Sequence, residues 1–173
     1  QTGVATRPIT DMNAYVDRLN RFVFRSGLVM KPIFSAAKSA VNKRVIYADG
    51  EDERVLRAAQ VVVEEGLAQP ILVGRPHVID VRLRRYGLKI VAGTDFTLIN
   101  PEDDPRYRHY VEELVSYAGR RGVNQEAART MVRTDSTVIA ALAVKRGDAD
   151  AMICGLEGRF ERNLRNVRLI IGA

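Results

Sequence analysis

Short apolar runs alternate with longer amphipathic segments from Arg44 onward, and this alternation constrains the fold more than any other feature of the sequence. Four runs have the composition of strands: RVIYA at 44–48, PILVG at 70–74, FTLIN at 96–100 and ADAMIC at 149–154. Strands separated by helices pair in parallel through right-handed crossovers. The sequence therefore predicts an α/β fold with a mainly parallel sheet and helices on both faces, preceded by two helices. The runs are apolar throughout, which is typical of strands buried on both faces.

Boundary signals mark the helices between these runs. The segment 75–87 has proline in its first turn and glycine at its end, which are favoured positions for both residues. Asp104, with the proline after it, is predicted to cap the helix that follows the third strand. Asn124 and Asp135 are predicted to cap the next two helices, and a last helix is predicted over 159–171.

The chain before the first strand divides into two parts. Residues 1–10 are polar, turn-rich and without periodicity, so we expect a linker. Residues 11–42 are expected to form a helical linker or docking segment. It contains a first helix stopped by Gly27 and a second helix with Pro32 in its first turn. Residues 43–173 then form the α/β domain.

Charge and hydropathy argue against several classes of function. The net charge is +6 and the pI is about 9.8, but acidic residues are interleaved with the basic ones, so no nucleic-acid-binding patch stands out. No stretch approaches the ~18 consecutive apolar residues of a membrane span. Cys154 is the only cysteine, which excludes an internal disulfide and fits a reducing, cytoplasmic environment. A small anionic ligand or an acidic partner domain would explain the positive charge.

The segment CGLEG at 154–158 follows the fourth strand and leads into the last helix. Open α/β sheets bind anionic ligands at such loops, where the strand ends and a helix N-terminus begins. Gly155 and Gly158 would allow backbone N–H groups to approach a phosphate. The same spacing also occurs in plain turns, and it matches neither the dinucleotide-binding nor the P-loop fingerprint.

Four arginines recur at every third position of the last predicted helix: Arg159, Arg162, Arg165 and Arg168. They form either a cationic wall for phosphates or a solvated face supported by acids such as Glu161. Arginine suits the first role because its planar fork holds two oxygens at once. Arg159 and Arg165 are the anion-contacting candidates.

Other reactive residues have simpler structural explanations. The acidic run 51–53 stands at a helix start, where each carboxylate is favourable by about 0.3–1 kcal/mol. His77 and His109 are isolated and lack the spacing of metal ligands. Cys154 has no histidine nearby in sequence to act as its base. We therefore expect no catalytic residue and no metal site in this chain.

Three segments carry a resemblance to known families. KRVIYADGEDERVLRAAQVVVEEGLAQPILVG at 43–74 is similar to the opening of the phosphate acetyltransferases, or phosphotransacetylases, and KRGDADAMICG at 145–155 is similar to their segment GDADGMVSG. GVATRPI at 3–9 and the helix after it resemble the junction in bacterial two-domain NADP-dependent malic enzymes. There a malate-decarboxylating dehydrogenase precedes a phosphotransacetylase-like domain. The resemblance implies the isocitrate/isopropylmalate dehydrogenase-like phosphotransacetylase fold, and covers only its N-terminal half.

The loop after the fourth strand departs from the family pattern. The transferases continue with SGAxHSTxxTxRPA, whereas bulky and charged residues follow Gly155 here. The arginine of TxRP corresponds to Arg165, which is retained. A second CoA-contacting arginine of the family falls near Ala118, where Arg120 or Arg121 could substitute for it. The catalytic serine and aspartate of the family belong to its second half, which the resemblance does not cover.

The resemblance implies a regulatory acyl-CoA-sensing and oligomerising domain, not catalytic by itself, of an NADP-dependent malic enzyme that converts malate to pyruvate and CO2. Acetyl-CoA is the expected effector, bound by Arg165, Arg159, Gly155 and Gly158. NADP and Mg or Mn would belong to the upstream domain, and the partners are that domain and further copies of the chain. Two alternatives stay open: an active phosphate acetyltransferase, which moves acetyl between CoA and phosphate, and a purely structural assembly domain.

Overall fold

The computed structural model describes three stretches of the chain: residues 11–16, 27–40 and 43–172. The chain divides into two compact units, Gln1–Ser39 and Ala40–Ala173. The predicted linker and most of the first predicted helix lie outside the described residues. Within the described part, no helix combines the length and the apolar character that crossing a bilayer requires.

Two predictions for the first unit are wrong. Gly27 does not end a helix but begins α2, which spans Gly27–Ser39. Pro32 therefore lies inside this helix and not in its first turn. A proline inside a helix removes one backbone hydrogen bond. The helix nevertheless extends upstream of it, because leucine, methionine and lysine in the sequence before Pro32 are strong helix formers.

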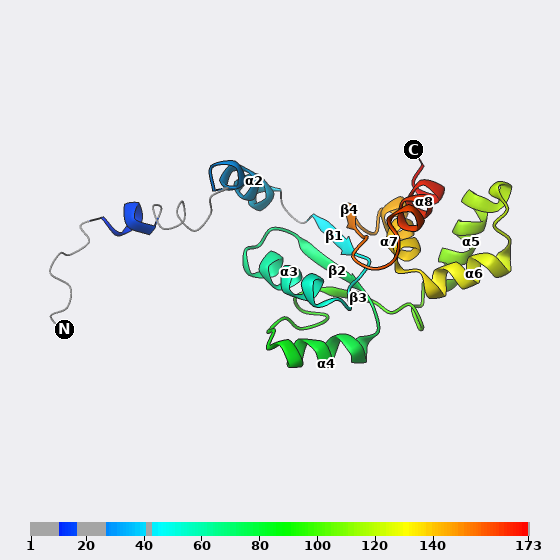
Figure 1. The fold of residues 1–173 in the computed structure, drawn as a ribbon, viewed down its shortest axis with the longest axis horizontal. Coiled ribbons are helices and arrows are strands. Elements are labelled where there is room, and N and C mark those ends of the chain that lie inside the picture. The colour runs from blue at the N-terminus through cyan, green and yellow to red at the C-terminus, as the bar shows by residue number, and fades with distance from the viewer. Residues whose placement is uncertain (1–10, 17–26, 41–42, 173) are drawn as a thin grey trace. The chain divides into compact units, whose positions relative to one another are not determined.

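The second unit is built on a four-stranded parallel sheet with the strand order β3-β2-β1-β4 (Figure 1). The strands are β1 (Arg44–Tyr47), β2 (Gln69–Val73), β3 (Thr97–Ile99) and β4 (Ala151–Ile153). All four predicted strands are confirmed. In the register of the sheet, Ile46 of β1 lies between Ile71 of β2 and Met152 of β4. Because the pairing is parallel, the carboxyl ends of all four strands meet at one edge of the sheet.

Helices cover both faces of the sheet, as predicted (Figure 1). On one face lie α3 (Glu53–Glu64) and α4 (Pro76–Tyr86). The other side carries α5 (Tyr107–Ala118), the short 3-10 helix η1 (Gly119–Arg121), α6 (Gln125–Thr134), α7 (Ser136–Arg146) and α8 (Phe160–Ile170). The predicted caps of α6 and α7 are confirmed, since Asn124 accepts a hydrogen bond from the Ala127 N–H and Asp135 accepts one from the Thr137 N–H.

The two cores meet at the central strands. Ile46 and Ile71 face the core with α7, whereas Tyr47 and Leu72 face the core with α3 and α4. Successive side chains of a strand point to opposite faces, so β1 and β2 contribute to both cores, as apolar runs predict. Every residue of α7 from 137 to 143 is buried, which makes it the central helix of its side.

Two local predictions are wrong. Asp104 does not cap α5, which begins at Tyr107; its side chain instead accepts a hydrogen bond from the Arg106 N–H at 2.8 Å. An aspartate often bonds two residues ahead in this way, and this local turn competes with helix initiation. The fourth strand is not buried on both faces either, because it lies at the edge of the sheet. Ile153 of β4 is 49% exposed.

Candidate functional site

The turn after β1 lies tightly against the end of β2. The Gly50 N–H donates to the Val73 carbonyl oxygen at 3.1 Å, and a Cβ atom on Gly50 would lie 2.6 Å from that oxygen. Only glycine allows so close an approach without displacing the strand. The turn therefore holds Asp49 at the carboxyl edge of the sheet, next to the end of β4.

Asp49 connects this turn to the loop 154–159 that follows β4. One oxygen of its carboxylate, Oδ2, accepts hydrogen bonds from the backbone N–H groups of Gly155 at 3.1 Å and Leu156 at 2.9 Å. Asp49 is only 9% exposed. Gly155 and Gly158 have φ angles of 103° and 78°, in the region that favours glycine. The predicted glycine-hinged loop is present, but two of its amides already have an anionic partner within the chain.

A second carboxylate, that of Asp135, joins α7 to α8. Its Oδ1 caps α7, while its Oδ2 accepts hydrogen bonds from Asn166 at 2.7 Å and from Arg162 at 3.1 Å. Asn163 lies one turn earlier on the same buried face, and its amide donates to the Glu157 carbonyl at 3.0 Å. The loop 154–159 is thus fixed at both ends by buried polar side chains.

The four arginines of the predicted cationic wall do not act as one surface. Arg162 binds Asp135, and Arg159 is the N-cap residue of α8, with no side-chain hydrogen bond or ion pair to any described residue. Arg165 and Arg168 lie along a different part of α8. A drift of about 300° per three residues distributes such a series around a helix. The hollow that Arg165 lines contains no residue of the loop 154–159.

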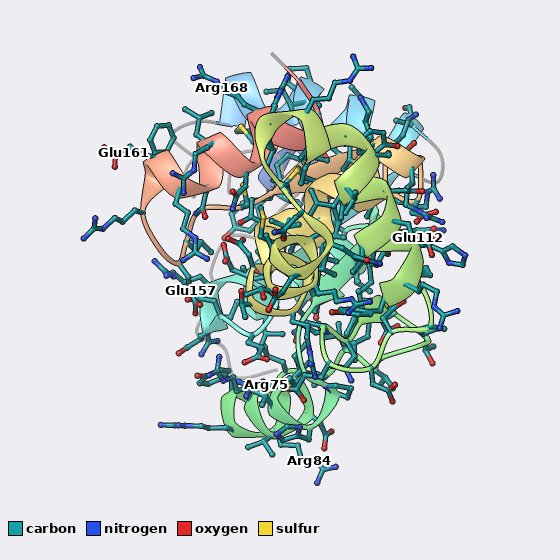
Figure 2. The ribbon with its side chains drawn as sticks, turned by 90° about the vertical axis from the view of Figure 1, so that its right-hand side faces the viewer. Arg75, Arg84, Glu112, Glu157, Glu161 and Arg168 are labelled. Atoms are coloured by element: carbon teal, nitrogen blue, oxygen red, sulfur yellow. The ribbon has the colours of Figure 1, made fainter. Side chains whose placement is uncertain are left out.

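Arg165 lines a hollow of about 410 Å³ on the surface of α8, which we call the arginine hollow. Its lining consists of Arg121, Glu161, Leu164, Arg165, Arg168 and Leu169. Figure 2 shows Glu161 and Arg168 along α8 and Glu157 apart from them on the preceding loop. Arg121 comes from η1 and lies close to the last turn of α8, where its guanidinium donates to the Arg168 carbonyl at 3.5 Å. Three arginines, one glutamate and two leucines thus line the hollow.

The edge of the sheet carries a smaller hollow of about 180 Å³, which we call the strand-end cleft. Asp49, Glu51 and Glu157 line it, together with Arg133 and the hydroxyl residues Thr134 and Ser136. Arg75 donates to both oxygens of Glu51 at 2.9 Å, and these hydrogen bonds lower the pKa of Glu51. The carboxylates keep the strand-end cleft more acidic than the arginine hollow.

The acidic run after β1 has mainly structural roles, as the sequence favoured. Asp52 caps α3 by accepting a hydrogen bond from the Arg54 N–H, and its hydrogen bonds with Arg54 lower its pKa to about 2. Glu53 forms an ion pair with Arg57 one turn along the helix. Among residues 11–16, 27–40 and 43–172, no group of three or more potential ligands is placed to hold a metal ion.

Cys154 lies half-buried at the start of the loop. Burial raises the pKa of its thiol, and the negative charges of Asp49 and Asp135 raise it further. A thiol is nucleophilic only as the thiolate, so this environment disfavours reactivity.

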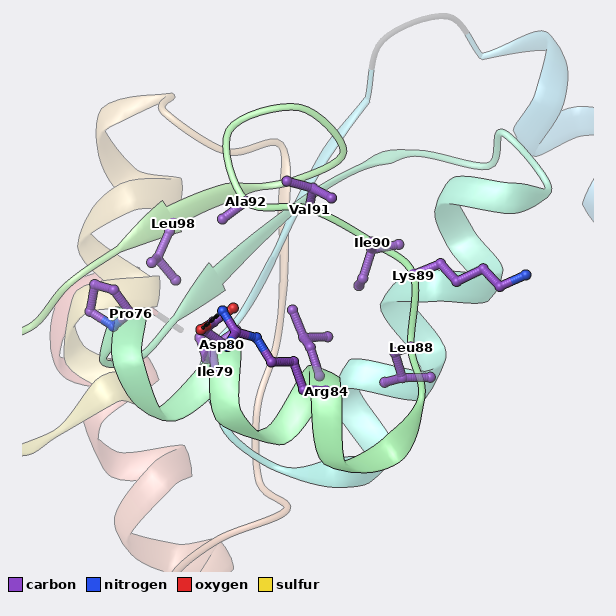
Figure 3. Close-up of a pocket in the computed structure, with 11 residues that line it drawn as sticks. Pro76, Ile79, Asp80, Arg84, Leu88, Lys89, Ile90, Val91, Ala92 and Leu98 are labelled. Atoms are coloured by element: carbon purple, nitrogen blue, oxygen red, sulfur yellow. Dashed lines mark ion pairs between the residues drawn. The ribbon is translucent and has the colours of Figure 1, made fainter.

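A third hollow, of about 400 Å³, lies between α4 and the segment 88–98 (Figure 3). Its walls are largely apolar, and the ion pair between Asp80 and Arg84 lies at its rim. None of the predicted site residues lines it.

The comparisons with known proteins agree with the predicted resemblance. The family model described as phosphate acetyl/butaryl transferase matches residues 28–173, so the match begins within α2, upstream of the predicted start at Lys43. An NAD-dependent malic enzyme from Rhizobium meliloti is 66% identical over 99% of this chain, and an NADP-dependent malic enzyme from Escherichia coli is 48% identical over 99% of it. The chain spans 22% of each of these relatives.

A solved structure gives the same fold. A phosphotransacetylase from Streptococcus pyogenes superposes with a TM-score of 0.70 at 28% identity, over 81% of this chain and 42% of that one. The predicted fold class is therefore confirmed.

The sequence analysis did not predict the buried polar residues of this site. Asp49, Asn163 and Asn166 were not among the candidate site residues, yet Asp49 and Asn163 hold the loop and Asn166 binds Asp135. The two asparagines stand three positions apart in an arginine-rich helix, a spacing that places them on one face. That spacing is the signal from which their burial could have been predicted.

Proposed function

Because the chain belongs to the phosphate acetyl/butaryl transferase family, we propose that it forms a regulatory domain of a malic enzyme, which senses an acyl-CoA and assembles the oligomer. The parent protein would oxidise and decarboxylate malate to pyruvate and CO2. This chain is similar both to an NAD-dependent and to an NADP-dependent malic enzyme. The coenzyme of the parent protein is therefore NAD or NADP in this proposal, and not NADP alone. The nicotinamide and divalent-metal sites would belong to residues outside this chain.

The main support for the proposal is that Arg121 and Arg165 line the same hollow. These residues come from η1 and α8, and the fold brings them together over Leu164 and Leu169. Guanidinium groups bind phosphates through paired hydrogen bonds, and an apolar floor accommodates a ring or an aliphatic chain. CoA thioesters combine several phosphates with such apolar parts. Arg121 would then supply the charge that the family carries near Ala118.

Arg159 and the two glycines have a weaker place in this proposal. The N–H of Gly155 already donates to Asp49, so it would have to leave that partner before it could bind a ligand. Arg159 has its side chain free of any described partner and can still approach an anion from the N-terminus of α8. Arg165 and Arg121 therefore become the principal ligand residues.

An active phosphate acetyltransferase is the second candidate, and family membership favours it. Catalysis requires groups that stabilise the transition state more than the bound substrates. The loop presents Glu157 to the strand-end cleft, a negative charge that opposes a developing oxyanion. The regulatory proposal is therefore preferred.

The experiment uses the intact malic enzyme that contains this chain. We expect acetyl-CoA to change the rate of malate oxidation without being consumed, and acetyl phosphate to form from acetyl-CoA and phosphate no faster than without enzyme. Robust acetyl phosphate formation would establish the transferase. The purely structural assembly role would be supported by three results together. Malate oxidation would not change, acetyl-CoA would not bind, and the oligomer would be lost when residues 43–173 are deleted.

A further inference from the structure

The loop 154–159 binds a carboxylate of its own chain, whereas its sequence predicted that it binds an anionic ligand. Two successive backbone N–H groups, of Gly155 and Leu156, converge on a single oxygen of Asp49. Convergent amides of this kind form an anion-binding concavity. In this chain a carboxylate from the turn after β1 fills it.

Several features keep Asp49 in this position. Gly50 is held against β2 by the hydrogen bond that its N–H donates to the Val73 carbonyl oxygen. The Asp49 carbonyl accepts a hydrogen bond from the Asp52 N–H at 3.0 Å, which closes the turn. No ion pair joins Asp49 to a described arginine or lysine, so the two loop amides are the hydrogen-bond partners of its carboxylate. A buried carboxylate is costly without such partners, so Asp49 and the loop stabilise each other.

The surroundings also oppose an added anion. Glu157 lines the strand-end cleft beside Asp49, as does Glu51, whose charge is balanced by its ion pair with Arg75, and Arg133 is the basic residue in the lining. Arg54, which is close enough to feel the charges of Asp49 and Glu157, forms its own ion pair with Asp52 at 2.9 Å. Like charges in a partly buried cleft are poorly screened by salt.

We propose that Asp49 is a specificity-determining residue, whose carboxylate occupies the loop amides and thereby excludes inorganic phosphate and other small oxyanions from the strand-end cleft. Among the described residues, an anion is then expected to bind where arginines converge, away from the loop. This role goes beyond the proposed function, because it concerns which anions are excluded from the strand-end cleft. It holds whether or not an acyl-CoA binds to the arginine hollow.

The test follows the amide resonances of Gly155 and Leu156 by NMR during titration of the 173-residue chain with inorganic phosphate at constant ionic strength. Three variants are compared with the unchanged chain: Asp49→Asn, Asp49→Ala and Asp80→Asn. Asp80→Asn is the matched control, because it removes the same charge from an exposed position on α4.

In the unchanged chain and in the control we expect no saturable shift of the two resonances. In both Asp49 variants we expect a saturable shift, with phosphate bound at least about tenfold more tightly, or roughly 1.4 kcal/mol. Asp49→Asn keeps a neutral oxygen beside the two N–H groups, which supports the fold if Asp49→Ala fails to fold. A charged phosphate binds N–H groups more strongly than this neutral oxygen and can displace it. Saturable shifts of equal affinity in the unchanged chain would overturn the proposal, as would folded Asp49→Asn protein whose two amides ignore phosphate.

Discussion

The carboxylate of Asp49 accepts a hydrogen bond of 3.1 Å from the backbone N–H of Gly155, a residue 106 positions later in the chain. Parallel pairing explains this contact, because the ends of β1 and β4 meet at the same edge of the sheet. The contact turns a loop with the composition of an anion-binding site into a loop bound by its own chain. The three arginines that line one hollow lie instead on α8 and η1.

Asp135 is expected to be a major contributor to stability. Asp135→Ala removes the cap of α7 and leaves the buried amide of Asn166 without its acceptor. A cap contributes about 1 kcal/mol, and an unsatisfied buried polar group costs about 1–3 kcal/mol. We expect the free energy of unfolding, from urea denaturation, to fall by about 2–4 kcal/mol. Asp80→Ala, which breaks an exposed ion pair, should change it by no more than about 0.5 kcal/mol. Equal effects of the two substitutions would contradict the role assigned to Asp135.

Gly50 and Gly119 should respond in opposite directions to replacement by alanine. A Cβ atom on Gly50 would lie 2.6 Å from the Val73 oxygen, so we expect Gly50→Ala to lower the melting temperature and the unfolding free energy, the latter by about 1–3 kcal/mol. Gly119 has helical dihedral angles, and its nearest neighbour would lie at 3.9 Å. Gly119→Ala should raise stability by about 0.4–1 kcal/mol. A Gly50→Ala protein as stable as the unchanged chain would show that the turn is not held against β2.

The pKa of Asp52, lowered to about 2, predicts a contribution to acid stability. A carboxyl group whose pKa is lower in the folded state stabilises the protein above its unfolded pKa, and this stability is lost as the pH falls through the folded pKa. Asp52→Asn keeps a good cap but removes the titration. Between pH 4 and pH 2, the unfolding free energy of this variant should therefore decrease less steeply with falling pH. A slope identical to that of the unchanged chain would argue against the hydrogen-bonded pair with Arg54.

Cys154 should react slowly with iodoacetamide at neutral pH, because burial and two neighbouring carboxylates raise the pKa of its thiol. Asp49→Asn removes one of these charges, so the alkylation rate of the folded protein should increase. The rate of each urea-unfolded protein is the reference, and should be the same for both. If the folded Asp49→Asn protein reacted no faster than the unchanged chain, the charge of Asp49 would not act on the thiol.

The sheet was predictable because continuous apolar runs such as RVIYA and PILVG, separated by capped amphipathic helices, leave few alternatives to a parallel α/β fold. The exposure of Ile153 was not predictable, because it depends on the order of the strands in the sheet. This order is decided by long-range pairing, which leaves β4 at the edge. Asp104 failed as a helix cap for a local reason, since its side chain bonds the nearer Arg106 N–H.

The candidate site was predicted only in part. The glycine-containing loop after the fourth strand follows from sequence, whereas the carboxylate that binds its amides, that of Asp49, comes from a turn more than a hundred residues earlier. The periodicity of the arginines predicted that they lie on a helix, but it did not predict which of them forms an ion pair with Asp135. Arg162 forms this ion pair, while Arg165 meets Arg121 across a hollow. Both outcomes depend on how α8 packs against α7 and η1.

The proposed function requires the arginine hollow to bind the phosphates of an acyl-CoA. Calorimetric titration of acetyl-CoA into the intact protein that contains this chain is the most direct test, with Arg165→Ala, Arg121→Ala and, as control, Arg84→Ala on α4. We expect each of the first two substitutions to weaken binding at least about tenfold, which is the loss of roughly one charge-assisted contact, and the control to leave it unchanged. Binding of equal affinity in all four proteins, or no binding by the unchanged protein, would contradict the proposed function.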